Sequence, residues 1–258
     1  MLRHLFKSLR PDHPVGLLFD VDGLLIDNTR EIHLAYQSLL ANRGVVMEGG
    51  ERFPGINLFD ILERMKRKYA LSSSVEELVA ERRDEYLRIL SRGTFDLCDG
   101  VAELFGVLDG LRGCDQVRFA YVSSSEKCFT DILFRNVFDR IGLPQYASDP
   151  DGFFFRWEGV AANTAWEPRL QKKPHPMLYQ LACQKLALDP SQCIAFEDAP
   201  SGWVSALDAG LNLVVIQHES DHQTSSDLIR DAERQGRVYA VKSLREFLPF
   251  IESLSRAV

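Results

Sequence analysis

The chain of 258 residues lacks several features that would assign it to a specialised class of protein. It has no run that approaches the ~18 apolar residues of a membrane-spanning helix. Its net charge of −7 argues against a nucleic-acid partner, since a phosphate backbone selects a basic surface. The first ten residues are basic but lack the apolar core and cleavage site of a secretory signal. A frayed tail or a first helical turn is therefore favoured there over a short targeting leader.

Paired cysteines are also missing. The five cysteines are odd in number and form no Cys-x-x-Cys pair: Cys98, Cys114, Cys128, Cys183 and Cys193. This usage favours reduced thiols and a cytoplasmic location. The apolar content of 45% and the charged content of 26% are those of an ordinary globular protein. The length allows one α/β domain with a smaller insertion.

Short apolar runs alternate with helical patterns in most of the chain. The expected strands are 15–19, 117–122, 193–196, 213–216 and 238–241, and the expected helices are 101–111, 127–136, 176–186, 201–208, 226–234 and 244–254. Repeated β-α units of this kind predict a parallel sheet with helices on both faces and right-handed crossovers. The fold class is therefore α/β, with a Rossmann-like core.

A helical block interrupts this alternation between residues 28 and 95. Helices are expected at 29–43, 58–69 and 75–90, and no convincing strand lies among them. Ser74 and Glu77 have the spacing of a capping box at the start of the third helix. The block predicts a small all-helical unit inserted after the first strand.

Residues 146–171 also fit the alternation poorly. This segment is rich in aromatic residues, with Phe153, Phe154, Trp157 and Trp166 among them, and an Asp-Gly turn signal at 151–152. An extra hairpin or a flap against the sheet edge would accommodate it. Packing is favoured over substrate contact as the role of its aromatic side chains.

Polar residues with catalytic potential stand where predicted strands meet helices. They are Asp20 and Asp22, then Ser123 to Ser125, then the Lys172-Lys173-Pro174 stretch, then Glu197 and Asp198. Each group alone is weak evidence, because such acids and serines commonly cap helices and such lysines are commonly solvated. In open α/β sheets, however, ligands gather outside the carboxyl ends of the strands. Four such groups in order therefore favour a catalytic site.

These residues resemble the motifs of the haloacid dehalogenase superfamily, in the branch of β-phosphoglucomutase-like and phosphoglycolate-phosphatase-like hydrolases. The first motif is Phe19-Asp-Val-Asp-Gly23, and the second is a serine at a strand end, Val122-Ser123. The third is Lys173-Pro-His-Pro176, and the fourth is Phe196-Glu-Asp-Ala-Pro-Ser-Gly202. A single Asp-x-Asp would be weak evidence, whereas four motifs in order, spanning residues 19 to 210, are strong.

The resemblance implies a role for each acid. Asp20 would be the nucleophile that forms an aspartyl-phosphate, and Asp22 the general acid and then the base. Mg²⁺ would be held by the carboxylates of Asp20 and Asp198 and by the backbone carbonyl of Asp22. Glu197 completes the expected metal set and would reach the ion through a water rather than directly.

The resemblance also implies how the phosphoryl group is held. Ser123 and the backbone N–H groups of Ser124 and Ser125 would contact its oxygens, and the turn at Gly23 would leave room for it. Lys173 would neutralise its charge. Lys172 stands beside it, so which of the two lysines enters the site stays open, with the Lys-Pro pair favouring Lys173.

The helical block resembles the small helical cap of the family, which closes over the core and confers specificity. The implied division is a core of residues 1–27 and 97–258 and a cap of residues 28–96. The implied function is a Mg²⁺-dependent phosphatase acting on a small phosphorylated metabolite, as a monomer or homodimer with no nucleic-acid or membrane partner. A sugar-phosphate mutase and a non-catalytic binding protein are the alternatives. The turn at 53–58 has no Arg where mutases of the family carry one, which favours hydrolysis.

Overall fold

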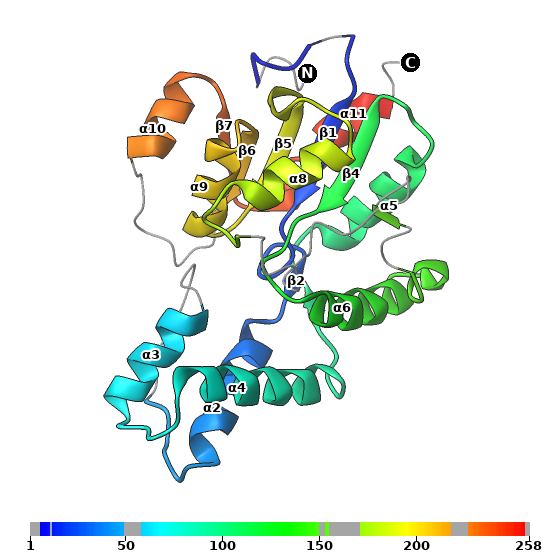
Figure 1. The fold of residues 1–258 in the computed structure, drawn as a ribbon. Coiled ribbons are helices and arrows are strands. Elements are labelled where there is room, and N and C mark those ends of the chain that lie inside the picture. The colour runs from blue at the N-terminus through cyan, green and yellow to red at the C-terminus, as the bar shows by residue number, and fades with distance from the viewer. Residues whose placement is uncertain are drawn as a thin grey trace.

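The computed structural model describes residues 6–10, 12–48, 58–149, 153–154, 171–217 and 227–255. A five-stranded sheet forms the centre of the core, and its neighbouring strands are all parallel (Figure 1). In spatial order the strands are β4 (Val117–Tyr121), β1 (Val15–Phe19), β5 (Cys193–Glu197), β6 (Asn212–Ile216) and β7 (Val238–Val241). Strands β1, β5 and β6 are buried along their whole length, which explains their continuous apolar runs. The predicted parallel sheet is confirmed.

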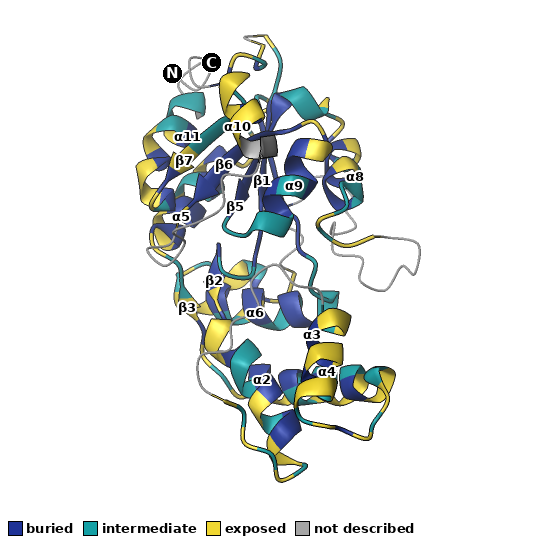
Figure 2. Cartoon of the chain, turned by 90° about the vertical axis from the view of Figure 1, so that its left-hand side faces the viewer, coloured by how far each residue is buried: buried dark blue, intermediate teal, exposed yellow. Residues whose placement is uncertain are grey.

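Helices cover both faces of this sheet, as predicted. Helices α8 and α9 lie on one side, and α5 and α11 lie on the other (Figure 2). The bounds of the core helices are α5 (Val101–Leu111), α6 (Lys127–Arg140), α8 (Met177–Lys185), α9 (Pro200–Asp208), α10 (Asp227–Arg234) and α11 (Leu248–Ser255). Short 3₁₀ turns occur at Pro144–Tyr146, Pro190–Gln192 and Leu244–Glu246. Among the described residues, no helix is both long and apolar enough to cross a bilayer.

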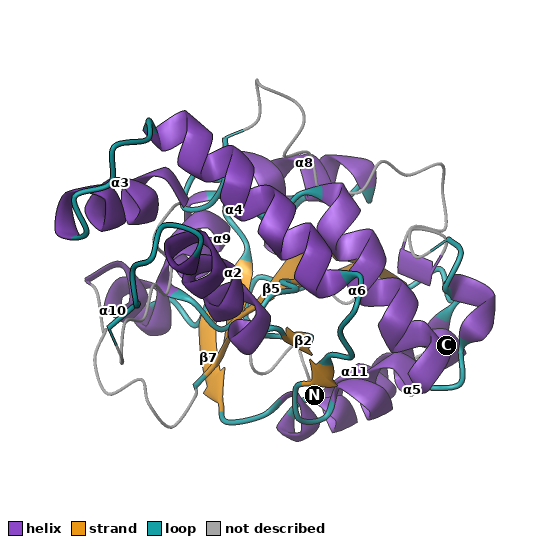
Figure 3. Ribbon diagram, turned by 90° about the horizontal axis from the view of Figure 1, so that it is seen from below, coloured by secondary structure: helices purple, strands orange, loops and turns teal. Residues whose placement is uncertain are grey.

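The three helices of the inserted block lie together, below the sheet in the view of Figure 1, and Figure 3 shows them from below, in front of the sheet. They are α2 (Thr29–Ala41), α3 (Leu58–Lys68) and α4 (Val75–Leu90), close to the predicted ranges. The predicted capping box at Ser74 and Glu77 is confirmed by both of its hydrogen bonds. The block has a hydrophobic cluster of its own, formed by Tyr36, Leu39, Leu40, Ile61, Leu62, Met65, Leu71 and Leu78. A separate cluster supports our proposal that residues 28–96 form a cap domain.

A two-stranded ribbon joins the inserted block to the core. Strand β2 (Ile26–Asp27) pairs antiparallel with β3 (Asp96–Leu97), so the two connecting segments lie side by side. The sequence analysis did not predict this ribbon, because two residues are too few to show alternation of apolar and polar side chains. The pairing depends on segments about 70 positions apart that only the tertiary fold brings together.

Two predicted helices differ from the structure. The expected helix at 244–254 is interrupted, with a 3₁₀ turn at Leu244–Glu246 before α11 begins at Leu248. Pro249 has no N–H to donate and its ring clashes with the preceding turn, so the helix restarts with proline in its first turn. Helix α6 extends beyond residue 136 to Arg140, because Val137 and Phe138 continue its buried stripe.

The aromatic-rich segment is described only in part. Phe153 and Phe154 are buried against Phe105 and Phe138, with ring centroids 5.1 to 6.4 Å apart. The packing interpretation is therefore confirmed for these two residues. The expected hairpin, Trp157 and Trp166 lie outside the described residues, as does most of the 53–58 turn.

Candidate active site

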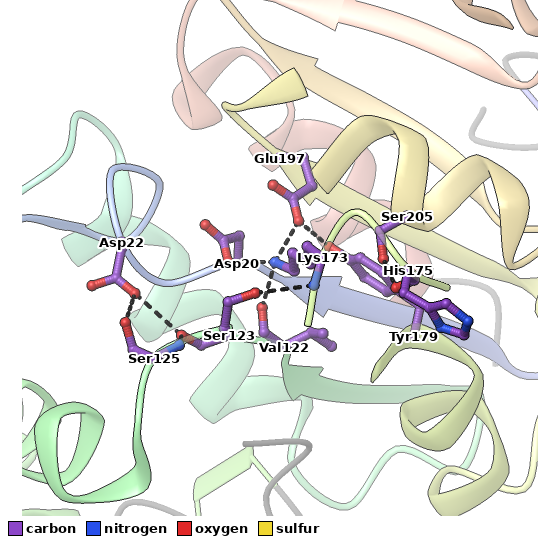
Figure 4. Close-up of polar contacts among 11 residues, drawn as sticks. Asp20, Asp22, Val122, Ser123, Ser125, Lys173, His175, Tyr179, Glu197 and Ser205 are labelled. Atoms are coloured by element: carbon purple, nitrogen blue, oxygen red, sulfur yellow. Dashed lines mark hydrogen bonds and ion pairs between the residues drawn. The ribbon is translucent and has the colours of Figure 1, made fainter. Parts of the chain in front are cut away.

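The ends of three adjacent strands bring the predicted residues to one edge of the sheet. In the parallel register, Phe19 of β1 lies opposite Tyr121 of β4 and Phe196 of β5. Asp20 directly follows Phe19, and its backbone N–H still donates to the Phe196 carbonyl, at 3.0 Å. Strands β1, β4 and β5 therefore deliver Asp20, the serine segment and the Glu197-Asp198 pair to one place (Figure 4).

Lys173 lies at the centre of this group. Its ammonium donates to Asp20 Oδ1 and Glu197 Oε1, both at 2.5 Å, and to the Val122 carbonyl at 2.8 Å. Only 5% of its side chain is exposed. Burial alone would lower the pKa of Lys173, but the two carboxylates outweigh burial and raise it. Of the two adjacent lysines, the structure brings Lys173 into the carboxylate group.

Three carboxylates crowd around this single ammonium. Oxygens of Asp20, Glu197 and Asp198 all lie within 4.8 Å of one another. Burial raises the pKa values of Asp20 and Asp198 to about 8, and repulsion from Glu197 adds to the shift at Asp20. The pKa of Glu197 is also raised by burial, and Lys173 opposes that shift. Tyr179 donates from its hydroxyl to Glu197 Oε1 at 2.5 Å. One lysine therefore leaves an excess of negative charge.

This donor set fits a hard divalent cation. Carboxylate oxygens are the ligands that Mg²⁺ and similar ions prefer, and a cation would offset both the burial and the mutual repulsion that raise the three pKa values. The backbone also leaves space beside the cluster. Gly23 has a φ of +88°, and a Cβ at this position would collide with the Asp198 carboxylate. The turn after Asp22 therefore requires glycine both for its conformation and for its approach to Asp198.

Asp22 points away from this cluster toward the segment after β4 (Figure 4). Its carboxylate accepts hydrogen bonds from Ser123 Oγ at 3.1 Å, from Ser125 Oγ at 2.7 Å and from Asn28 Nδ2 at 2.5 Å. The Asp22 side chain is not part of the carboxylate cluster that could hold a metal. The two acids of the first motif thus occupy different environments, and this difference is required if they have different roles.

The serines connect the two halves of the site. Ser123 Oγ accepts from the Ser125 backbone N–H at 2.9 Å while it donates to Asp22. Ser124 Oγ accepts from the Lys173 backbone N–H at 3.3 Å. The loop that carries Lys173 is further tied to α9, because Ser205 Oγ donates to the His175 carbonyl at 2.7 Å. These bonds fix the serine and lysine segments relative to each other.

Sequence reasoning missed Asn28 and Tyr86. Asn28 stands at the N-cap of α2, where asparagine normally accepts a hydrogen bond from the helix backbone, yet its side chain makes no capping bond. Its amide instead donates to Asp22 and to the Tyr86 hydroxyl of α4, the latter at 2.8 Å. An asparagine in this position looks like a helix cap in the sequence, so no local pattern distinguishes the two roles.

Cys98 is a further residue that the sequence did not indicate. It follows β3, and its thiol donates to the Gly23 carbonyl at 3.2 Å. Burial and the nearby carboxylates of Asp27 and Asp198 raise the pKa of this thiol to about 12. Cys98 is therefore a neutral thiol that helps to hold the turn after Asp22. All five cysteines are free thiols.

Comparison with known proteins gives consistent matches over most of the chain. The family model of the haloacid dehalogenase-like hydrolases matches residues 15–210. Protein CbbY of Rhodobacter capsulatus is 32% identical over 213 residues, which cover 79% of this chain and 86% of that protein. Hexitol phosphatase B of Escherichia coli strain K12 is 24% identical over 215 residues, covering 80% and 85%. The crystal structure of CbbY from Rhodobacter sphaeroides in complex with phosphate has the same fold, with a TM-score of 0.65, 20% identity and coverage of 91% and 96%.

Proposed function

This chain belongs to the haloacid dehalogenase-like hydrolases, and on that premise we propose that it is a Mg²⁺-dependent phosphatase of a small phosphorylated metabolite. The proposal rests above all on one observation, the buried ammonium of Lys173 between Asp20 and Glu197. A phosphoryl group spreads its charge over three oxygens, so its transfer depends mainly on positioning and on neutralisation of negative charge. The names of hexitol phosphatase B and of validoxylamine A 7'-phosphate phosphatase, a second relative, support this choice of substrate class.

Asp20 acts as the nucleophile in the proposed first step. One of its oxygens bonds to the phosphorus while the bond between the phosphorus and the leaving oxygen breaks. Asp22 gives its proton to that leaving oxygen, so the product departs as an alcohol. Lys173 balances the charge on Asp20 and on the phosphoryl oxygens. Burial excludes water around Asp20, so the attraction between this fixed positive charge and the negative oxygens is stronger than it would be in water.

Water completes the cycle in the proposed second step. It attacks the phosphorus of the aspartyl-phosphate, and its proton passes to Asp22 as the bond between phosphorus and Asp20 breaks. Inorganic phosphate leaves, and both carboxyl groups return to their initial states. Ser123 and Ser125, which donate to Asp22 Oδ2, hold the carboxylate at the edge of the cluster between the two proton transfers.

The cation would be held by Asp20 and Asp198, with the backbone carbonyl of Asp22, and with Glu197 through a water. When bound, Mg²⁺ would supply positive charge that draws the phosphoryl group toward Asp20. Glu197 already accepts hydrogen bonds from Lys173 and Tyr179 on one oxygen, and this supports a secondary role for it at the metal.

The proposal is tested by the release of inorganic phosphate from p-nitrophenyl phosphate in the presence of Mg²⁺. Asp20→Asn should lower kcat at least about a thousandfold, because an amide is a poor nucleophile. Asp84→Asn is the matched control, since Asp84 is exposed on α4 and should leave kcat unchanged. Release of phosphate by Asp20→Asn at the wild-type rate would refute the mechanism. Transfer of the phosphate to another carbon of a sugar phosphate, with no release, would establish a mutase instead.

A further inference from the structure

Tyr179 is a buried residue that contacts the catalytic group, although the proposed reaction gives it no role. It lies in the first turn of α8, and none of its surface is exposed. Its hydroxyl donates to Glu197 Oε1 at 2.5 Å, and the Lys173 ammonium donates to the same oxygen at 2.5 Å. A phenolic hydroxyl keeps its proton at neutral pH, so it acts here as a donor. The hydroxyl and the ammonium therefore share one carboxylate oxygen.

All three N–H groups of the Lys173 ammonium are engaged. An ammonium has three donors, and their acceptors here are Asp20 Oδ1, Glu197 Oε1 and the Val122 carbonyl. Glu197 belongs to β5, Asp20 directly follows β1, and Val122 directly follows β4. The Val122 carbonyl has no net charge. The position of the ammonium therefore depends mainly on the balance between the attraction of Asp20 and that of Glu197.

Glu197 has little freedom to change its place in this balance. Its carboxylate is 1% exposed, and a Cβ on Gly202 of α9 would overlap both of its oxygens. Close packing on that side prevents the carboxylate from moving away from Lys173. In the part of the chain that the structure describes, its side chain accepts from Lys173 and Tyr179. A buried carboxylate that lost the Tyr179 donor would depend on Lys173 alone.

The Tyr179 hydroxyl limits how strongly Glu197 attracts the ammonium. The positive end of the O–H dipole lies at Glu197 Oε1 and offsets part of the negative charge of this oxygen. Lys173 therefore keeps a larger share of its charge for Asp20 and for the phosphoryl oxygens. The proposed reaction requires positive charge at that place, because negative charge develops there in the transition state.

The aromatic ring of Tyr179 makes a second contact with the same lysine. The Lys173 ammonium lies 5.2 Å from the centre of this ring, within the range of attraction between a cation and an aromatic face. Phenylalanine would keep the ring and its packing. Tyr179→Phe therefore removes the hydroxyl alone, and the two contacts can be separated by experiment.

We propose that Tyr179 is a positioning residue, which donates to Glu197 and thereby keeps the Lys173 ammonium directed to Asp20. This inference rests on the proposed function and deepens it, because it gives a residue of α8 a part in neutralising the transition state. Tyr179 acts through Glu197 and Lys173 and does not itself touch the reacting atoms.

Steady-state hydrolysis of p-nitrophenyl phosphate by Tyr179→Phe tests this role. Without the hydroxyl the ammonium should move toward Glu197, so its charge at Asp20 should be weaker. We expect kcat to fall about tenfold or more and KM to change less than about threefold. Tyr146→Phe is the matched control, since it removes a hydroxyl that donates to Asp109 outside the site, and it should keep both values. A wild-type kcat in Tyr179→Phe, or a loss confined to KM, would overturn the inference.

Glu197→Gln tests whether the effect passes through Glu197. An amide oxygen attracts an ammonium much less than a carboxylate does, so the hydroxyl would have little attraction to offset. Adding Tyr179→Phe to Glu197→Gln should lower kcat less than about threefold, compared with about tenfold or more in the wild-type background. Equal losses in both backgrounds would show that Tyr179 does not act through the charge of Glu197.

Crystal structures of the metal-free wild type and of Tyr179→Phe measure the contact without turnover. We expect the distance between Lys173 Nζ and Asp20 Oδ1 to exceed about 3.5 Å in the variant, and an unchanged hydrogen bond would contradict the inference. If Tyr179→Phe does not fold, Tyr179→Met takes its place, because its flexible side chain fills similar space without a donor. Wild-type activity compared with that of Asp20→Asn tests the phosphatase separately, so a failure of the proposed function is distinguished from a failure of this inference.

Discussion

Glu197 shows how individual contacts assign roles to neighbouring residues. Its carboxylate is 1% exposed and accepts from Lys173 and Tyr179 on the same oxygen. Asp198, the next residue, directs its carboxylate to Gly23 on the adjacent turn. Two consecutive acids where β5 ends thus have different partners, although their oxygens lie within 4.8 Å of each other. Because Lys173 and Tyr179 already occupy Glu197, this difference supports Asp198 as the stronger candidate for direct metal contact.

A glycine behind Glu197 provides the first prediction at the residue scale. A Cβ on Gly202 would overlap the Glu197 carboxylate, which Lys173 and Tyr179 hold in place. Gly202→Ala should therefore lower the free energy of unfolding by about 1–3 kcal/mol and lower phosphatase activity. Urea denaturation without Mg²⁺ measures the first effect.

A second glycine is the matched control for this substitution. Gly106 lies within α5, and a Cβ there would meet no atom within 4 Å. Gly106→Ala should raise the free energy of unfolding by up to about 1 kcal/mol, because alanine loses less backbone entropy in a helix. If the two variants were equally stable, the close approach of Gly202 to Glu197 would have no energetic importance.

Helix α4 links the inserted block to the catalytic acids at the scale of an element. Its capping box fixes its start, and Leu78, Tyr86 and Leu90 are buried along it. Tyr86 accepts from Asn28 near Asp22, and Arg83 pairs with Glu126 at the start of α6. The same helix therefore supplies packing for its own block, a hydrogen bond toward the site and an ion pair to the core.

The Tyr86 hydroxyl provides the prediction at this scale. Tyr86→Phe removes the oxygen that accepts a hydrogen bond from the Asn28 amide. Asn28 is only 1% exposed, so water does not readily replace this acceptor. The freed amide can rotate, so its hold on Asp22 should weaken, and kcat should fall about tenfold with a smaller change in KM. Steady-state kinetics with p-nitrophenyl phosphate measures both quantities.

Tyr146→Phe is the control for this change. The Tyr146 hydroxyl donates to Asp109 at 3.0 Å, on a part of the core outside the catalytic group. This variant should keep the wild-type kcat. Equal kcat values for Tyr86→Phe and wild type would show that the Asn28 contact does not position Asp22 for proton transfer.

At the scale of the whole molecule, folding buries the carboxyl groups of Asp20 and Asp198 at one edge of the sheet. In the metal-free protein, burial raises the pKa values of Asp20 and Asp198 to about 8, whereas an unfolded aspartate titrates near 4. The folded state therefore binds protons more tightly than the unfolded chain between these two pH values. This contribution to stability is complete below about pH 4 and is lost as the pH rises through about 8.

Mg²⁺ should reverse this pH dependence. The ion binds the deprotonated carboxylates, so its apparent affinity rises with pH over the same range. Mg²⁺ at 100 times its Kd should raise the Tm by about 5–10 °C at pH 8.5. The same concentration should raise the Tm less at pH 5.5. Scanning calorimetry with and without a chelator measures the shifts. Asp198→Asn should reduce the gain at pH 8.5, and an equal gain at both pH values would contradict the assignment.

The sequence by itself determined the strands, most helices and the order of the four motifs. Apolar runs of four to six residues mark buried parallel strands, and adjacent carboxyl ends of such strands must converge. Together with the four family motifs, this convergence indicated Asp20, Lys173 and Asp198 as residues of one site. Even the bounds of α4 and its capping box follow from local spacing.

Only the tertiary structure decided how these side chains face one another. It directed Asp22 to Ser125 and Asn28, and it placed Lys173 rather than Lys172 between two carboxylates. It also buried Arg82 against Tyr36, from another helix 46 positions earlier in the chain. Local patterns specify which residues form an element and which face is buried. The contacts between elements depend on how those faces pack, and no single segment contains that information.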